Sequence, residues 1–225
     1  MSLLLEAFES LPVRRPSDDP DLFRAGAEEA LLEFHTTVTE RYTEGTLGRI
    51  LSTHLDPRQR KAAAVALGLV GTMASNSVVA QALHDHDLLV RQAASDAIWD
   101  IWFRGEGGRQ ASGLRQAMAV KDQAERIAEY DDLIQQYPEF AEAYNQRAIQ
   151  LFNVGHFAKA VSDCQEALRL NPYHFGAAAG LGQCFLRMNK PGAAVRAFAH
   201  ALELNPDLDN LRMVMETLRD AMDWE

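Results

Sequence analysis

Residues 141–174, AEAYNQRAIQLFNVGHFAKAVSDCQEALRLNPYH, decide the fold, because residues 175–208, FGAAAGLGQCFLRMNKPGAAVRAFAHALELNPDL, repeat their pattern without a gap. The offset is 34 residues, and eight positions are identical. These positions are Ala143/Ala177, Ala160/Ala194, Val161/Val195, Ala167/Ala201, Leu168/Leu202, Leu170/Leu204, Asn171/Asn205 and Pro172/Pro206. Self-similarity at such a period is typical of stacked helical pairs, each of which buries its apolar face against the next.

The repeat resembles the tetratricopeptide repeat (TPR) family. In that family small residues lie where paired helices touch, here Ala148, Ala160 and Ala167, then Gly182, Ala194 and Ala201. Large residues fill the space between them, here Leu151, then Leu181, Phe185 and Phe198. Cys164 departs from the pattern, because it stands where an aromatic residue is usual. The resemblance implies units over residues 141–174 and 175–208.

Both flanks of this pair extend the array. Residues 105–140 read as a degenerate first TPR-like unit in which Tyr130, Leu133 and Pro138 keep the register. The glycine-rich stretch RGEGGRQASG (104–113) predicts a hinge before it. Residues 209–225 predict a capping helix whose apolar stripe is Leu211, Val214, Met215, Leu218 and Met222, with Trp224 near its end.

Residues 46–104 show a second repeat with a shorter period. Residues 56–70 overlay residues 87–101 with five identical positions, the first of which is Asp56/Asp87. Asp is a strong helix N-cap, and the alanines that follow allow close helix packing. The pattern D-P-x-x-R-x-x-A-A-x-A-L-G resembles the HEAT repeat family in its short bacterial form, which implies two helix–turn–helix units.

The N-terminal region, residues 1–45, predicts a helical cap. Its long helix places Phe23, Ala27, Leu31, Phe34, Val38 and Tyr42 on one face, which would cover the open end of the HEAT-like pair. The apolar first eleven residues are expected to dock on that helix. The alternative is that these eleven residues bind a partner.

The stretch HDHD (84–87) is a candidate for metal or acid/base chemistry. Its alignment with the first HEAT-like unit places Asp87 at a helix N-cap and the histidines in a turn, with no further ligand nearby. We therefore expect a capped, solvated turn, no metal and no cofactor. Trp99 and Trp102, which close the same unit, are expected to pack in the core or at the junction instead of forming a ligand cage.

Composition narrows the function classes. The net charge is −10 and no basic cluster exceeds Arg58, Arg60 and Lys61, which argues against nucleic-acid binding. No apolar run is long enough to span a membrane, and the start lacks the features of a signal peptide. The two cysteines, Cys164 and Cys184, fall at helical core positions and are expected to be buried, inert thiols. We predict a cytoplasmic protein without a membrane or nucleic-acid partner.

No catalytic motif stands out in the chain, whereas the TPR resemblance implies a binding surface. In that family the first helix of each unit lines a concave groove that takes a peptide or a partner helix. The residues at these positions are Arg115, Glu142, Asn145, Ile149, Asn153, Gly176, Ala179, Gln183 and Arg187. Gly176 and Ala179 predict a hollow, flanked by Asn145 and Gln183, that takes a bulky side chain; the alternative is that the glycines only permit close packing. Ala179 and Gly180 stand where the carboxylate clamp of TPR chaperone adaptors needs a basic residue, so binding of an acidic C-terminal tail is not expected.

The predicted fold is an all-α, right-handed α-α superhelical solenoid of HEAT-like and then TPR units. The predicted function is that of a non-enzymatic adaptor or assembly scaffold which binds a protein or peptide in the TPR groove and bridges two partners if the HEAT-like surface also binds. Two alternatives stay open: a HEAT-like enzyme or cofactor-handling protein of the lyase type, and a structural protein that self-associates.

Overall fold

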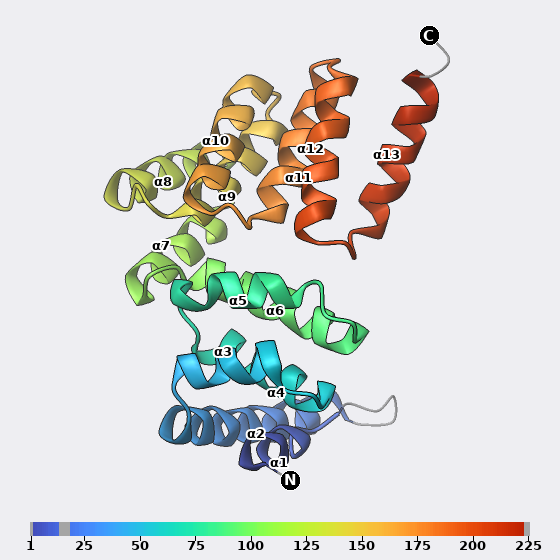
Figure 1. Cartoon of the computed structure of the whole chain (residues 1–225). Coiled ribbons are helices and arrows are strands. Elements are labelled where there is room, and N and C mark those ends of the chain that lie inside the picture. Colours follow the sequence, from blue (N-terminus) through green and yellow to red (C-terminus); the bar gives the residue numbers. More distant parts are fainter. Residues whose placement is uncertain (1, 14–18, 223–225) are drawn as a thin grey trace. The chain divides into compact units, whose positions relative to one another are not determined.

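The computed structural model describes residues 2–13 and 19–222, and all regular elements within them are helical (Figure 1). The predicted all-α class is confirmed. The chain forms two compact units, residues 1–101 and 102–225. The division falls inside one helix and precedes the predicted hinge at residues 104–113.

Unit 1 is built on the alanine-rich second helix of the first HEAT-like pair. Its elements are α1 (Leu3–Glu9), α2 (Pro20–Arg41), α3 (Glu44–Thr53), α4 (Pro57–Val70), the short 3-10 helix η1 (Met73–Ser75), α5 (Asn76–Ala82) and most of α6 (Leu88–Arg104). Helices α1, α2 and α3 all pack on α4. Ala62, Ala63, Ala64 and Ala66 are fully buried, so small side chains on several faces of α4 let its neighbours approach closely.

The first residues of the chain dock as predicted. Leu4 and Leu5 of α1 are buried, and the backbone N–H of Leu4 donates to the Tyr42 hydroxyl at 3.0 Å. Phe8 packs on Phe34 of α2 with ring centroids 6.2 Å apart. The predicted stripe on α2 holds at Phe34 and Val38 but not at Leu31, which is 42% exposed, because the described buried side chains of α2 lie in its C-terminal half.

The two predicted N-caps are confirmed. Asp56 Oδ1 accepts the backbone N–H of Arg58 at 2.9 Å, and Asp87 Oδ1 accepts the N–H of Leu89 at 2.8 Å. In the HDHD stretch His84 and His86 are exposed, as predicted, whereas Asp85 is largely buried in a bidentate ion pair with Arg60 (both N–O distances 2.7 Å). The HDHD stretch therefore holds a structural ion pair.

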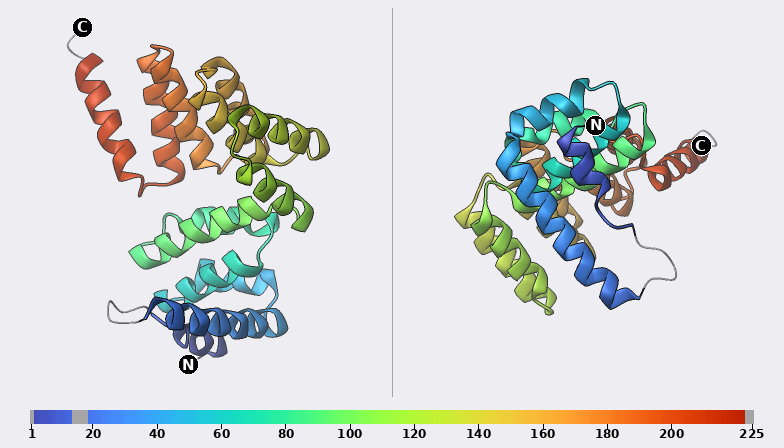
Figure 2. Two further views of the ribbon diagram at one scale, coloured as in Figure 1. Left: turned by 180° about the vertical axis from the view of Figure 1, so that it is seen from behind. Right: turned by 90° about the horizontal axis from the view of Figure 1, so that it is seen from below.

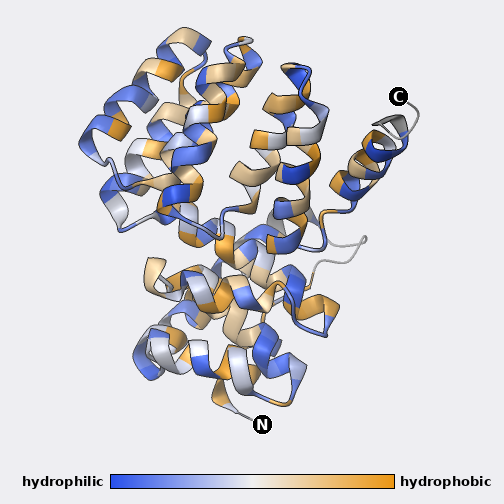
Figure 3. Ribbon diagram, turned by 45° about the horizontal axis from the view of Figure 1, so that its top comes forward, coloured by the Kyte–Doolittle hydropathy of each residue, from blue (hydrophilic) through white to orange (hydrophobic). Residues whose placement is uncertain are grey.

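Unit 2 is a run of helices in which each packs on the next (Figures 1 and 2). Its elements are α7 (Gly108–Ala119), α8 (Gln123–Gln136), α9 (Ala141–Asn153), α10 (Phe157–Leu170), α11 (Phe175–Arg187), α12 (Pro191–Leu204) and α13 (Asp209–Met222). Apolar and polar residues alternate around these helices, as their coloured ribbons show (Figure 3). Such amphipathic helices bury one stripe against each neighbour.

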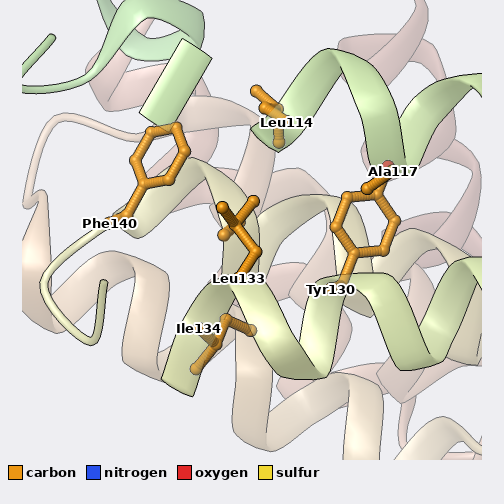
Figure 4. Packing of buried hydrophobic residues seen from close by; sticks show 7 residues of the cluster. Leu114, Ala117, Tyr130, Leu133, Ile134 and Phe140 are labelled. Carbon is orange, nitrogen blue, oxygen red and sulfur yellow. The ribbon is translucent and has the colours of Figure 1, made fainter. Parts of the chain in front are cut away.

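The degenerate first pair has a core of its own. Leu114 and Ala117 of α7 pack against Tyr130 and Leu133 of α8, and Phe140 closes the cluster (Figure 4). More than half of the predicted glycine-rich hinge belongs to α7, which begins at Gly108.

The last pair needs a glycine. A Cβ on Gly182 would lie only 2.3 Å from the Phe198 ring, so the missing side chain makes room for that ring. The predicted stripe of α13 packs on this pair through Leu211, Val214, Met215 and Leu218. The side chain of Met222, and Trp224, lie outside the described residues.

Candidate peptide-binding groove

The first helices of the second and third TPR-like pairs, α9 and α11, pack on each other and enclose a cavity of about 160 Å³. Four of the predicted groove residues line it: Asn145, Ile149, Gly176 and Gln183. The other lining residues are Ala148, Phe152, Cys164, Gly180 and Cys184. We call this cavity the α9/α11 pocket.

Glycine makes the α9/α11 pocket hollow. Gly176 and Gly180 lie one helical turn apart on α11 and place no side chain in it. Phe152 and Ile149 supply an apolar wall from α9, and Ile149 is 43% exposed at the rim. An engineered cavity of about 150 Å³ with an apolar lining binds benzene, so a pocket of this size fits one Leu, Met or Phe side chain.

Glu142 does not face a partner, contrary to prediction. It is only 1% exposed, and its carboxyl group accepts hydrogen bonds from three side chains. Asn145 Nδ2 (3.2 Å) and Gln146 Nε2 (2.7 Å) donate to Oε1, and His174 Nε2 donates to Oε2 at 2.8 Å. Sequence spacing placed Glu142 on the groove side of α9, but that part of the helix is covered by His174. Glu142 instead orients Asn145, whose amide lines the α9/α11 pocket.

His174 was not foreseen as a structural residue. Its Nδ1 accepts the backbone N–H of Ala177 at 3.1 Å and so caps α11, which leaves the ring hydrogen on Nε2, the atom that donates to Glu142. Its ring stacks on Trp102 with centroids 4.3 Å apart. Trp102 is buried and also packs on Phe175, which confirms its predicted packing role. A histidine directly before a predicted helix was the available signal, but only its contacts reveal its partners.

A second cavity, of about 510 Å³, lies between α11 and α13. We call it the α11/α13 pocket; its lining residues are Ala179, Gln183, Asp207, Leu208, Asp209, Asn210, Leu211 and Val214. Ala179 belongs here and not beside Gly176, so the single predicted hollow is in fact two pockets. Gln183 lines both and joins them. Among the described residues no Lys or Arg lines either pocket, whereas two aspartates line the second.

The remaining predicted groove residues line neither pocket. Arg187 is exposed, and its guanidinium lies over the rings of Phe152 (5.4 Å) and Phe157 (4.6 Å). Asn153 is exposed at the end of α9, and Arg115 is exposed on α7. These three residues are therefore exposed on the surface and line neither pocket. The position of a residue on a helical wheel does not decide which exposed residues border a pocket.

The two cysteines meet at the α9/α11 pocket. Both are buried, as predicted, and both belong to one cluster of buried residues. The hydrogen-bond interaction with Cys184, together with burial, raises the pKa of Cys164 well above its usual range, whereas the same interaction lowers the pKa of Cys184. A contact between residues 164 and 184 could not be read from the sequence.

Within residues 2–13 and 19–222 no three His, Cys, Asp or Glu side chains are placed to hold a metal ion. None of the helices in the same ranges combines the length and the apolar character needed to cross a bilayer.

The tetratricopeptide repeat family model matches residues 151–218. A TPR repeat-containing protein of Rhizobium etli is 30% identical over 76 residues, which are 34% of this chain and 37% of that protein. DnaJ homolog subfamily C member 7 of Homo sapiens is 30% identical over 107 residues, or 48% of this chain and 22% of that protein. The chain thus spans well under half the length of these curated relatives.

Solved structures similar to this chain include the first TPR of Spaghetti bound to an HSP90 peptide, with 23% identity and a TM-score of 0.44 over 51% of this chain and 88% of that one. A thermophilic TPR protein of Thermus thermophilus has 19% identity and a TM-score of 0.40 over 88% of this chain and 93% of that one. The family match does not extend to residues 46–104, where the HEAT-like assignment stays a prediction. The likeness of this chain to tetratricopeptide repeats therefore rests on residues 151–218.

Proposed function

We propose that this chain is a protein-interaction adaptor which binds an extended peptide across α9, α11 and α13, with one apolar side chain of the partner in the α9/α11 pocket. The observation that carries the proposal is the pocket itself: about 160 Å³, walled by Phe152 and Ile149, and left hollow by two glycines. Burying a Leu-sized or Phe-sized side chain there contributes roughly 1.5–3 kcal/mol.

Asn145 and Gln183 supply the polar part of the proposed site. Both amides line the α9/α11 pocket, and Glu142 holds Asn145 through its Nδ2 group. An amide offers both a donor and an acceptor, so it can pair with a peptide backbone without requiring a particular side chain. Because Glu142 has already ordered Asn145, less conformational entropy is lost when a peptide binds.

The charge of the groove argues against an acidic tail as the ligand. Asp207 and Asp209 line the α11/α13 pocket, and no basic residue in the described part of the chain lines either pocket. An acidic peptide would meet like charge there, which costs affinity. We therefore propose a neutral or basic peptide, in keeping with the expectation drawn from Ala179 and Gly180.

The HEAT-like assignment of residues 46–104 and the bridging of two partners are part of the proposal. The Asp-capped helices α4 and α6 support the HEAT-like assignment. A cavity of about 350 Å³ between the two predicted HEAT-like units supports the binding of a second partner. Leu55, which is 95% exposed, lies at the rim of that cavity. A cytoplasmic location is likewise proposed.

Selection of peptides from a random library on the immobilised protein tests whether the groove binds peptides. The variant is Ile149→Glu, and its matched control is Val154→Glu. Val154, the C-cap of the same helix, is also apolar and 39% exposed, but it lines neither pocket. We expect wild type and Val154→Glu to select peptides with a shared Leu, Met or Phe, and Ile149→Glu to bind them at least about tenfold more weakly, a loss of about 1.4 kcal/mol. Equal affinity for all three proteins would place binding elsewhere.

A further inference from the structure

The two cysteines of the chain combine three features that the peptide-binding proposal does not use. Cys164 of α10 and Cys184 of α11 belong to one cluster of buried residues. Both line the α9/α11 pocket, whose rim residues Ile149 and Gln183 are exposed. The sequence contains no other cysteine that could compete for either thiol.

The packing of α11 against α10 brings Cys164 and Cys184 close to each other. Gly180 lies one turn before Cys184 on the same face of α11, and a Cβ at Gly180 would lie 3.3 Å from Cys164 Sγ. Without a side chain at that position, α11 lies close against α10 beside Cys164. A disulfide bond joins sulfur atoms about 2.05 Å apart, so the two side chains must rotate toward each other to form it.

We propose that Cys164 and Cys184 form an intramolecular, reversible disulfide when a hydroperoxide enters the α9/α11 pocket. The Cys184 thiolate attacks the peroxide oxygen, the O–O bond breaks, and a sulfenic acid forms with release of water or an alcohol. The Cys164 sulfur then attacks the sulfenic sulfur, its proton leaves with the hydroxide as water, and the S–S bond forms. Overall, two thiols lose two electrons and two protons, and one hydrogen peroxide is reduced to two waters.

The electrostatics of the pair assign the roles within it. The hydrogen bond from the Cys164 thiol lowers the pKa of Cys184, and a larger thiolate fraction makes a cysteine more reactive. Cys164, whose pKa is raised, keeps its proton until the second step. Cys184 is thus the attacking sulfur and Cys164 the resolving one.

Intact mass spectrometry of the native protein after hydrogen peroxide treatment tests this disulfide. We expect wild type to lose both alkylatable thiols together, with a mass decrease of about 2 Da from the two lost hydrogens. The oxidised protein should stay monomeric on a non-reducing gel and should recover both thiols with dithiothreitol. Adducts of added oxygen without the 2 Da loss, disulfide-linked dimers, or two thiols that persist in the native chain but oxidise in denaturant would each overturn the proposal.

Single substitutions at Cys164 test the assignment of roles. Cys164→Ser keeps a hydroxyl that can donate to Cys184, whereas Cys164→Ala removes the donor, and both forbid the disulfide. We expect peroxide to oxidise Cys184 to its sulfenic acid several-fold faster in the serine variant, as measured with a dimedone probe. Equal rates in two variants with matching circular dichroism would show that Cys164 does not activate Cys184.

One consequence rests on the proposed function. If a partner's apolar side chain occupies the α9/α11 pocket, it covers the two thiols and excludes peroxide from them. A saturating concentration of a peptide from the library selection should therefore slow oxidation of the thiols at least about tenfold. Disulfide formation without peptide protection would contradict the peptide-binding proposal alone, whereas absence of the disulfide would contradict this inference alone.

Discussion

At the scale of single residues, the buried Glu142 carboxyl group matters most, because three side chains donate to it. Replacing it with Leu leaves the His174 N–H and the Asn145 amide without their acceptor inside the protein. We expect Glu142→Leu to lower the free energy of unfolding by about 3 kcal/mol, and Glu142→Gln by about 1 kcal/mol since an amide oxygen still accepts from His174. Urea denaturation measures both.

A surface carboxylate provides the comparison for Glu142. Glu139 is exposed two residues before α9, so Glu139→Gln should change stability by no more than about 0.5 kcal/mol. If Glu142→Leu were as mild as Glu139→Gln, the buried hydrogen bonds would not contribute to stability.

The Arg60–Asp85 ion pair makes stability depend on pH. Its side chains are 14% and 11% exposed, and the hydrogen bond from Arg60 lowers the pKa of Asp85. Because the folded-state pKa is lowered, the stabilisation is complete above about pH 4, the ordinary pKa of Asp, and is lost as the pH falls from there through the lowered pKa.

We therefore expect Asp85→Asn to lower the free energy of unfolding by about 2 kcal/mol at pH 7. The difference between wild type and variant should narrow below about pH 4. Urea titrations at pH 7, 4 and 2.5 measure this. A difference that stays constant down to pH 2.5 would assign the loss to packing and not to the charge on Asp85.

At the scale of helices, glycine at position 182 fixes how closely α11 approaches α12. Gly182→Ala gains helix propensity of about 1 kcal/mol, but its methyl group would overlap the Phe198 ring, and overpacking typically costs about 1–3 kcal/mol. We expect a net loss of stability of about 1 kcal/mol, measured as a lower midpoint of thermal unfolding.

Gly192 of α12 provides the matched control for Gly182. A Cβ there would meet only Arg196 Nη1, at 3.9 Å, so Gly192→Ala should raise stability by about 0.5 kcal/mol. If both alanine variants were stabilised, Phe198 would be free to move aside and Gly182 would not be required for packing.

At the scale of the whole molecule, the two units predict a regional response to damage. Leu4 and Leu5 of α1 are fully or almost fully buried, and α1 packs on α2 and α4. We expect the double variant Leu4→Ala/Leu5→Ala to lose about 4 kcal/mol in unit 1 and to speed amide exchange there, while exchange in α9 to α12 stays as in wild type. Hydrogen-exchange mass spectrometry resolves the two regions.

The neighbouring Leu3 gives the control for this experiment. It is 47% exposed, so Leu3→Ala should leave exchange unchanged throughout. Faster exchange in both units of the double variant would mean that the chain unfolds as one cooperative body.

Much of the architecture followed from the sequence alone. The helical pairs were recognised from the 34-residue repeat, the N-caps from Asp56 and Asp87, and the packing role of Gly182 from its place in that repeat. These features depend on backbone propensity and on the period of small and apolar residues, both of which are local properties that sequence records directly.

Tertiary structure decided which side chains meet and which way they face. Glu142 was expected in the groove but is buried by His174, 32 positions away. Ala179 and Gly176 line different pockets, whereas Cys164 and Cys184 line the same one. The predicted hollow between Asn145 and Gln183 exists, yet its size depends on the fit of α9 against α11. Helical spacing fixes the side of one helix on which a residue lies, but contacts between helices depend on how the helices approach each other, which the pattern of a single helix does not contain.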